Sequence, residues 1–159
     1  MSILLNYEVW HNILVKDIEE LTKVDQYLMR KILQCHSKVP IEFIYLETGC
    51  LSVSHIIMKR RLLYLQNILK RSEHELVRKV YLAQKCNPMK GDWCLSVKMD
   101  MQTINCHISD EHISKMTKIC YKKCITCQIQ ELALCKNKQK QSTHVKISHI
   151  KYDCLKIRE

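Results

Sequence analysis

Four of the chain's ten cysteines lie within one short stretch, CYKKCITCQIQELALC, at positions 120–135. Their spacing is C-x3-C-x2-C-x7-C, and thiolates so close together are typical zinc ligands. Cys124 and Cys127, followed by His144 and His149, also imitate the ligand order of a Cys₂His₂ finger. Such a finger places its cysteines on a hairpin and its histidines on a helix. Here the cysteines have helical spacing and the histidines lie in a polar segment, so the context does not match a finger.

A helix explains the same spacing without a metal. Steps of four, three and eight residues keep Cys120, Cys124, Cys127 and Cys135 on one side of an α-helix. Because reduced cysteine packs as a small hydrophobic residue, we interpret the stretch as a basic helix whose inner side carries cysteines. A zinc site made of these residues and His144 is the alternative.

No residue pattern in the chain indicates catalysis. Cys35-His36 and Cys106-His107 are sequence neighbours, and neighbouring side chains on a helix point about 100° apart. A cysteine nucleophile needs a histidine within hydrogen-bonding distance in space, and this spacing predicts none. We therefore expect no catalytic residue and no cofactor.

Basic residues are the candidates for binding, and they form two groups at close or helical spacing. They are Lys59, Arg60, Arg61, Lys115, Lys118, Lys122 and Lys123. Such rows can be solvated helix faces, or they can bind the phosphate backbone of RNA or DNA regardless of sequence. Aromatic residues make up only 6% of the chain, so bases are not expected to stack on an aromatic platform.

The overall composition is that of a basic helical protein. The net charge is +10, and residues 81–159 hold 14 basic against 7 acidic side chains. Only 2 glycines and 2 prolines occur in 159 residues, far fewer than sandwiches or barrels need for their turns. No apolar run approaches the ~20 residues of a membrane span, and the first residues do not form a signal peptide. We expect a protein of the cytoplasm or nucleus with reduced thiols and no membrane partner.

Apolar periodicity predicts six or seven helices and very little sheet, so we expect an all-α, irregular multi-helix bundle. The segment Val53–Lys70 is apolar around most of its circumference and should be the central helix. Six other helices are expected: Ile3–Trp10, Lys16–Gln34, the segment between Pro40 and Gly49, one segment after Ser72, one after Asp92, and a lysine-rich segment from Ser109 to about Asn137. The helix Lys16–Gln34 has one apolar stripe, formed by Ile18, Leu21, Val24, Leu28 and Ile32.

Polar residues before these segments predict how the helices begin. Ser52, Asp92 and Ser109 are expected N-caps, and Ser72 with Glu75 has the spacing of a capping box. Gly49 is expected to end its helix in the left-handed conformation. After Lys138 the sequence KQKQSTH predicts a polar tail.

Several motifs follow one another in order along the chain. They are LLNYEVW at 4–10, Val24-Asp25, Pro40 to Glu42, Tyr45 to Gly49, Ile56 to Leu69, and Gln84 to Trp93. Together they resemble the region downstream of the reverse transcriptase palm in non-LTR retrotransposon polyproteins, and the resemblance covers nearly the whole chain. It implies a thumb-like helical segment at 1–36, a post-thumb helical domain at 37–138 and a basic or polar tail at 139–159.

The resemblance also implies what the chain does. In such a polyprotein this region would help to hold the primer–template behind the active site. Two-metal nucleotidyl transfer needs converging carboxylates, and this chain has no Asp-Asp pair. We therefore expect a non-catalytic fragment of an RNA-directed DNA polymerase that binds RNA or DNA backbone non-specifically at most.

Two other functions are compatible with the residues. A helical fragment separated from its palm would expose apolar side chains such as Leu4, Leu5 and Trp10, through which it would self-associate or bind another helix. The other is the small zinc module built on the cysteine stretch.

Overall fold

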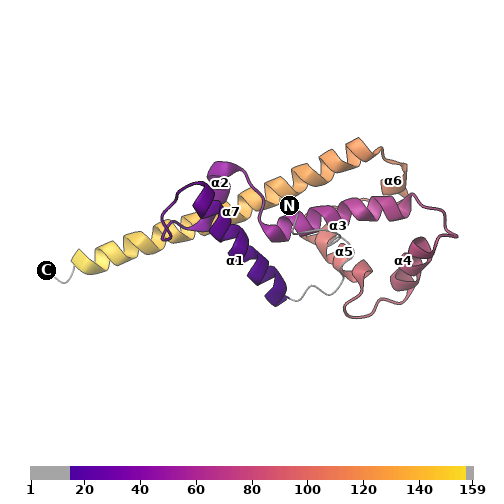
Figure 1. Ribbon diagram of the computed structural model, residues 1–159, viewed down its shortest axis with the longest axis horizontal. Coiled ribbons are helices and arrows are strands. Elements are labelled where there is room, and N and C mark those ends of the chain that lie inside the picture. The colour runs from indigo at the N-terminus through magenta and orange to yellow at the C-terminus, as the bar shows by residue number, and fades with distance from the viewer. Residues whose placement is uncertain (1–14, 157–159) are drawn as a thin grey trace.

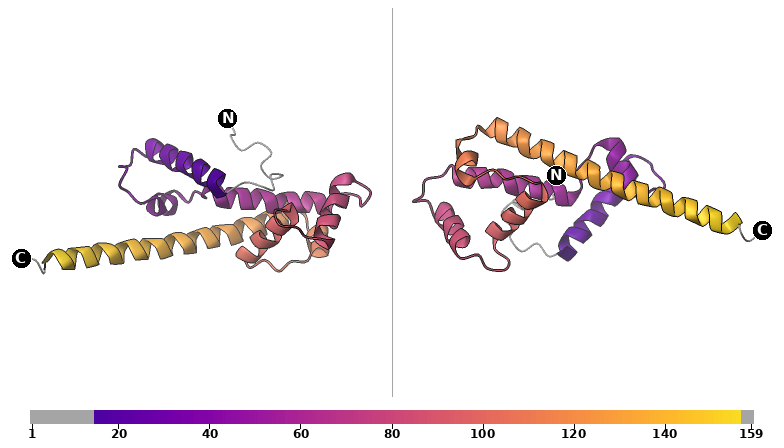
Figure 2. Two further views of the ribbon diagram at one scale, coloured as in Figure 1. Left: turned by 90° about the horizontal axis from the view of Figure 1, so that it is seen from below. Right: turned by 180° about the vertical axis from the view of Figure 1, so that it is seen from behind.

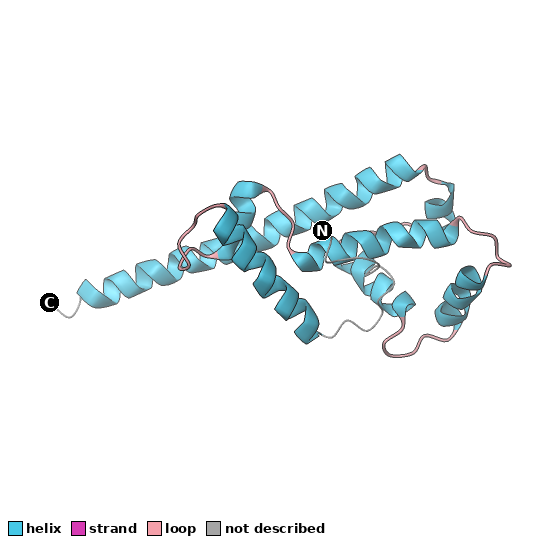
Figure 3. Cartoon of the chain, viewed as in Figure 1, coloured by secondary structure: helices cyan, strands magenta, loops and turns pink. Residues whose placement is uncertain are grey.

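The computed structural model describes residues 15–156, and within that range the chain forms helices and no strand (Figure 3). The helices are α1 (Val15–Ile32), α2 (Ile41–Thr48), α3 (Val53–Leu69), α4 (Leu76–Cys86), α5 (Trp93–Thr103), α6 (Asp110–Lys115) and α7 (Lys118–Lys156). The expected all-α bundle of six or seven helices is confirmed. The expected helix Ile3–Trp10, with Leu4, Leu5 and Trp10, lies outside the described residues.

The core is built around α3, as its apolar sequence predicts. Leu62 and Leu65 have no exposed surface, and Ile68 and Leu69 are nearly as well buried. Such complete burial follows from the position of α3, which is contacted by α1, α4, α5, α6 and α7. Because neighbours cover several sides of this helix, its hydrophobic residues need not be confined to one stripe.

The central helix α3 and the long helix α7 run antiparallel and side by side (Figures 1 and 2). Tyr121, near the start of α7, donates its hydroxyl hydrogen to the carbonyl oxygen of Leu62 at 3.2 Å. Further along α7, Ile125 and Ile129 have no exposed surface. The buried side of α7 is therefore the row that begins at Tyr121 and repeats every four residues.

The helices α4, α5 and α6 close the end of the core that is remote from the C-terminus (Figure 1). Trp93 at the start of α5 is buried, and its ring meets the rings of Tyr64 and Tyr81 edge-on, with centroids 5.8 and 6.3 Å apart. Edge-to-face pairs of this kind stabilise by about 1 kcal/mol beyond the burial of area.

The lysine-rich helix expected from Ser109 is in fact two helices, and this expectation was wrong. Ser109 does cap α6 by accepting a hydrogen bond from the His112 amide, but Met116 is extended and α7 begins at Lys118. The break exposes carbonyl groups at the end of α6. Gln66 donates to the carbonyl oxygens of Ile113 and Met116 at 3.2 and 3.1 Å. Bonds from a distant helix thus stabilise an interruption that local sequence does not signal.

The expected end of the lysine-rich helix at about Asn137 is also corrected, because α7 continues to Lys156 through the polar segment after Lys138. Lysine and glutamine are good helix formers, and the segment contains neither glycine nor proline. Polarity alone therefore did not end the helix. The last turns of α7 extend away from the other helices (Figures 1 and 2).

Only the first half of the apolar stripe of α1 packs on the core. Ile18 and Leu21 contact the buried pair Val53 and Ile57 of α3. Further along the helix, side chains of the same stripe are exposed, and Ile32 at its end is 74% exposed. The apolar residues do form one stripe, as predicted, but only the first half of that stripe contacts the core.

The other expected caps differ in detail. Ser52 is the N-cap residue of α3, yet its hydroxyl bonds to Ser54 and His55 rather than to a backbone amide. Asp92 precedes α5 but accepts from the Met89 amide at 2.7 Å.

At the next helix start, α4 begins one turn later than the proposed capping box. Its N-cap is Glu75, whose carboxylate accepts from the Ser72 amide. At the end of α2, Gly49 has the expected left-handed φ of 64°.

No single helix within residues 15–156 has the length and hydrophobicity of a membrane span; α2 and α3 meet these criteria only as a pair, which is bent by 51°.

Candidate nucleic-acid interface

Three of the seven basic candidates meet in one groove between α3 and α7. Lys59 comes from α3, and Lys122 and Lys123 come from the second turn of α7. They line an open groove of about 550 Å³ together with Ile119, Thr126, Cys127 and Gln130. The antiparallel packing of the two helices thus brings together lysines that are more than sixty positions apart in the sequence.

The charge of this groove is not compensated within it. No carboxylate lines it, and none of its three lysines forms an ion pair with a described residue. Glu131, one turn beyond the groove residue Cys127 on α7, accepts a weak hydrogen bond from the thiol of that cysteine at 3.5 Å. Three ammonium groups around one concave surface attract anions, and each is suited to contact a phosphate as a point charge.

One turn from the groove, α3 carries a histidine that adds no charge to this surface. His55, one turn before Lys59, is buried and lies close enough to Lys136 of α7 to be affected by its charge. Burial, and then the Lys136 ammonium, lower the pKa of His55. The imidazole is therefore held in its neutral form and adds no charge to this surface.

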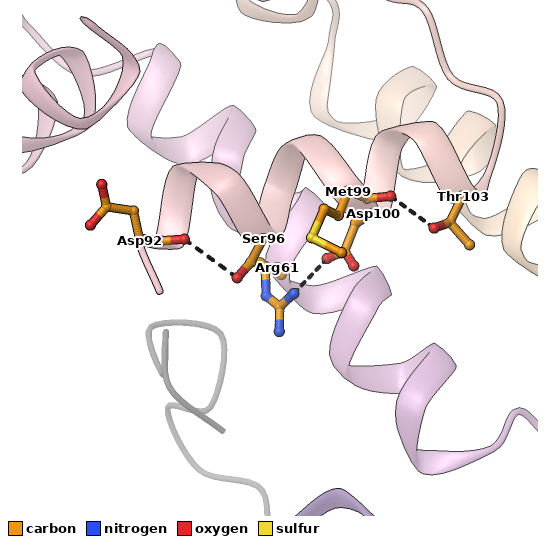
Figure 4. Close-up of polar contacts among 6 residues, drawn as sticks. All are labelled: Arg61, Asp92, Ser96, Met99, Asp100 and Thr103. Atoms are coloured by element: carbon orange, nitrogen blue, oxygen red, sulfur yellow. Dashed lines mark hydrogen bonds and ion pairs between the residues drawn. The ribbon is translucent and has the colours of Figure 1, made fainter. Parts of the chain in front are cut away.

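Arg61 does not belong to the groove, and its place among the binding candidates is corrected. Figure 4 shows its guanidinium pointing at Asp100 of α5, with Nη1 and Oδ2 2.9 Å apart. Both side chains are nearly enclosed, with 12% and 13% exposed. Burial raises the pKa of Asp100 to about 6, although the Arg61 charge and hydrogen bond act in the opposite direction. Arg61 is therefore a partner inside the fold, not a phosphate ligand.

The remaining basic candidates are spread over other surfaces. Arg60 is exposed on α3. Lys115 is on α6, where it pairs with Glu111 at 2.6 Å on a highly exposed surface. Lys118 opens α7 and is exposed. Because of the break at Met116, Lys115 does not continue the row of lysines on α7, so the predicted stripe of Lys115, Lys118 and Lys122 is not one helix face.

The cysteines of α7 do not form its inner side, and that interpretation was wrong. Cys120, Cys127 and Cys135 are exposed and only Cys124 is half-buried. A helical step of one residue is about 100°, so the buried row starting at Tyr121 lies to one side of the cysteine row. The cysteines occupy the flank of the helix.

The structure gives the zinc alternative no support. Among the described residues no group of three or more His, Cys, Asp or Glu side chains is placed to hold a metal ion. Burial raises the pKa of Cys124, and the hydrogen bond to Glu131 raises that of Cys127. Both effects favour the thiol, whereas zinc binds the thiolate. The side chain of His144 lies outside the described residues.

Sequence reasoning missed a second hollow, of about 430 Å³, between α4 and α5. Asp110 accepts hydrogen bonds there from the hydroxyl of Tyr81 and the ammonium of Lys85, both at 2.6 Å. The pKa of Tyr81 is raised by burial and by this bond. These residues are 25 and 29 positions from Asp110, so no local pattern could have grouped them. Lys85 and Asp110 form an ion pair, and Tyr81 donates to the same carboxylate. We therefore interpret the cluster as a contact that stabilises the fold.

Comparisons with known proteins add no relative. No protein-family model matches the chain, and no curated protein or solved structure shows significant similarity to it. Functional inference therefore depends on the groove and on the motif resemblance.

Proposed function

We propose that the chain is a non-catalytic helical module that binds the phosphate backbone of RNA or DNA without sequence specificity. The observation that carries the proposal is the groove in which Lys59, Lys122 and Lys123 converge from two helices, with no ion-pair partner among the described residues. The resemblance to the region behind the palm of a retrotransposon reverse transcriptase supports the same function. In that setting the groove would hold the primer–template as it leaves the active site.

The chemistry of the groove defines the ligand it would take. Lysine ammonium groups contact phosphate oxygens and carry no information about the base sequence. No aromatic side chain lines the groove, so stacking on unpaired bases would not contribute. A duplex, whose phosphates are regularly spaced, is therefore the preferred ligand, and an RNA–DNA hybrid is the form a reverse transcriptase product would have.

Salt dependence tests the proposal quantitatively. Each phosphate contact contributes about 0.9 to the slope of log affinity against log salt, so three lysines contribute about 2.7. This part alone lowers the affinity roughly 40-fold between 50 and 200 mM salt. The measurement is fluorescence anisotropy of a labelled RNA–DNA hybrid with the wild-type chain across this range.

A pair of triple variants separates the groove from net charge. Lys59→Gln, Lys122→Gln and Lys123→Gln remove the groove charges. Lys79→Gln, Lys90→Gln and Lys98→Gln remove three exposed charges on the α4–α5 side. Both reduce the net charge from +10 to +7. The groove variant should lose most of the slope of log affinity against log salt, whereas the matched control should keep that slope. Equal losses in both variants, or wild-type affinity independent of salt, would refute the proposal.

A further inference from the structure

The exposed face of α1 carries three kinds of residue in a definite order. Near its N-terminal end are Asp17 and Glu20, in its middle are Val24, Tyr27 and Leu28, and near its C-terminal end is Lys31. At about 100° per residue these six positions fall within an arc of about 100°. One face of this helix is thus acidic, then apolar, then basic.

The apolar middle of this face is open to solvent. Val24, Tyr27 and Leu28 are 48%, 60% and 45% exposed. The core contacts of α1 are made by other positions, including Ile18 and Leu21. Figure 2 (left) shows α1 and α7 on opposite sides of α3. Adjacent exposed apolar residues rimmed by charge are typical of a surface that binds another protein.

The order of charges indicates which protein fits. We propose that a second copy of this chain docks on this face, with the two α1 helices antiparallel about a two-fold axis between Val24 and Tyr27. In that arrangement position i of one helix lies opposite position 51 − i of the other, so Glu20 of each helix meets Lys31 of its partner. Val24 of each helix meets Tyr27 of the other, and Leu28 covers the rest of the apolar middle. A surface complementary to itself is what a two-fold interface requires.

Glu20 and Lys31 are available to make these contacts. Glu20 pairs within its own helix with Lys23 at 2.8 Å, but both side chains are largely exposed, and such pairs contribute little. Lys31 rests over the ring of Tyr27, with its ammonium 5.9 Å from the centroid, at the edge of the apolar middle. Both can therefore turn to a partner helix at small cost. A parallel arrangement would instead place like charges opposite each other.

The interface is small, because one face of one 18-residue helix contributes it. Contacts of this size are weak and reversible. The dimer should therefore be sought over a wide range of concentration, from about 1 to 500 μM. Sedimentation velocity of the full chain should show a mass that rises from 18.9 kDa toward twice that value.

Charge reversal tests the antiparallel geometry without disturbing the core. Glu20→Lys alone and Lys31→Glu alone each place like charges together at both ends of the dimer, so each should weaken association at least fivefold. An equimolar mixture of the two variants restores both attractive pairs and should dimerise again. Both positions are exposed, and circular dichroism checks that the variants fold.

An apolar variant tests the middle of the face. Leu28→Glu should abolish the dimer, whereas Leu76→Glu, at a still more exposed apolar position on α4, should not change it. A wild-type chain that stays monomeric at every concentration overturns the proposal. So does a dimer that both single charge reversals leave intact, because it would use another surface or a parallel arrangement. Neither outcome bears on the lysine groove, whose test uses different residues.

Discussion

Asp100 should make the stability of this protein fall as the pH rises from about 4 to 6. Its pKa is raised from an ordinary value of 3.8 to about 6, mainly by burial. The folded state therefore binds this proton more tightly than the unfolded state does. The stability that the group contributes is complete below pH ~4 and is lost as the pH rises through the folded pKa.

The size of the effect follows from the same values. Each pKa unit corresponds to about 1.4 kcal/mol, so a rise from 3.8 to about 6 corresponds to about 3 kcal/mol. Arg61 is already included in this balance, because its charge and hydrogen bond keep the pKa from rising further. At neutral pH the fold is therefore less stable with the charged Arg61–Asp100 pair than it would be with Asp100 protonated. This is expected where the cost of desolvating the carboxylate exceeds its attraction to the guanidinium.

The variant Asp100→Asn isolates this contribution, because asparagine has the shape of the protonated carboxyl group and does not titrate here. Urea unfolding of both proteins, followed by circular dichroism at pH 4, 5, 6 and 7, gives their difference in unfolding free energy. Relative to the variant, the wild-type chain should lose about 3 kcal/mol between pH 4 and 7.

A matched control comes from Glu111→Gln, which removes a carboxylate that is 77% exposed in its pair with Lys115. The difference in unfolding free energy between this variant and the wild type should change by less than about 1 kcal/mol between pH 4 and 7. A wild-type chain that gains stability relative to Asp100→Asn as the pH rises would refute the reasoning, since Arg61 would then outweigh burial.

Three further variants test buried polar contacts of α3. Arg61→Met should raise the pKa of Asp100 above its present value of about 6, because the charge that lowers it is gone; carboxyl NMR titration measures this. Tyr121→Phe removes the buried hydrogen bond to the Leu62 carbonyl and should cost about 1 kcal/mol of unfolding free energy, whereas an unchanged urea midpoint would contradict that role. Gln66→Met should cost about 1–3 kcal/mol, because the Ile113 carbonyl oxygen loses this donor, whereas that of Met116 keeps its hydrogen bond from Lys70; faster hydrogen exchange at the start of α7 would locate the loss.

What could be predicted from the sequence is what depends on nearby residues. The apolar composition of Val53–Leu69 predicted a central helix, and the only glycine between two apolar segments, Gly49, marked the end of α2 with the expected positive φ. Ser109 was identified as a cap because its bond to His112 spans three residues. In each case the cause and the effect lie within a few positions of each other.

What could not be predicted depends on partners far away in the chain. The break between α6 and α7 is stabilised by Gln66, about fifty positions earlier. The cysteine row looked like an inner face because its spacing is helical, yet the neighbouring row of Tyr121, Ile125 and Ile129 is larger and more apolar, and it took the core position. Periodicity shows that a face exists but does not show which of two adjacent faces is buried.

The tripeptide Lys59-Arg60-Arg61 shows how the same limit affects function. On a helix, residues that are neighbours in sequence point in different directions, so a basic cluster in the sequence is divided in space. Lys59 faces α7 and joins the groove, while Arg61 faces α5 and is held by Asp100. The concentrated charge arises instead where Lys59 meets Lys122 and Lys123 of another helix. A basic surface that depends on the packing of α3 against α7 should be lost when that packing is lost. Nucleic-acid affinity and unfolding should therefore share one urea midpoint.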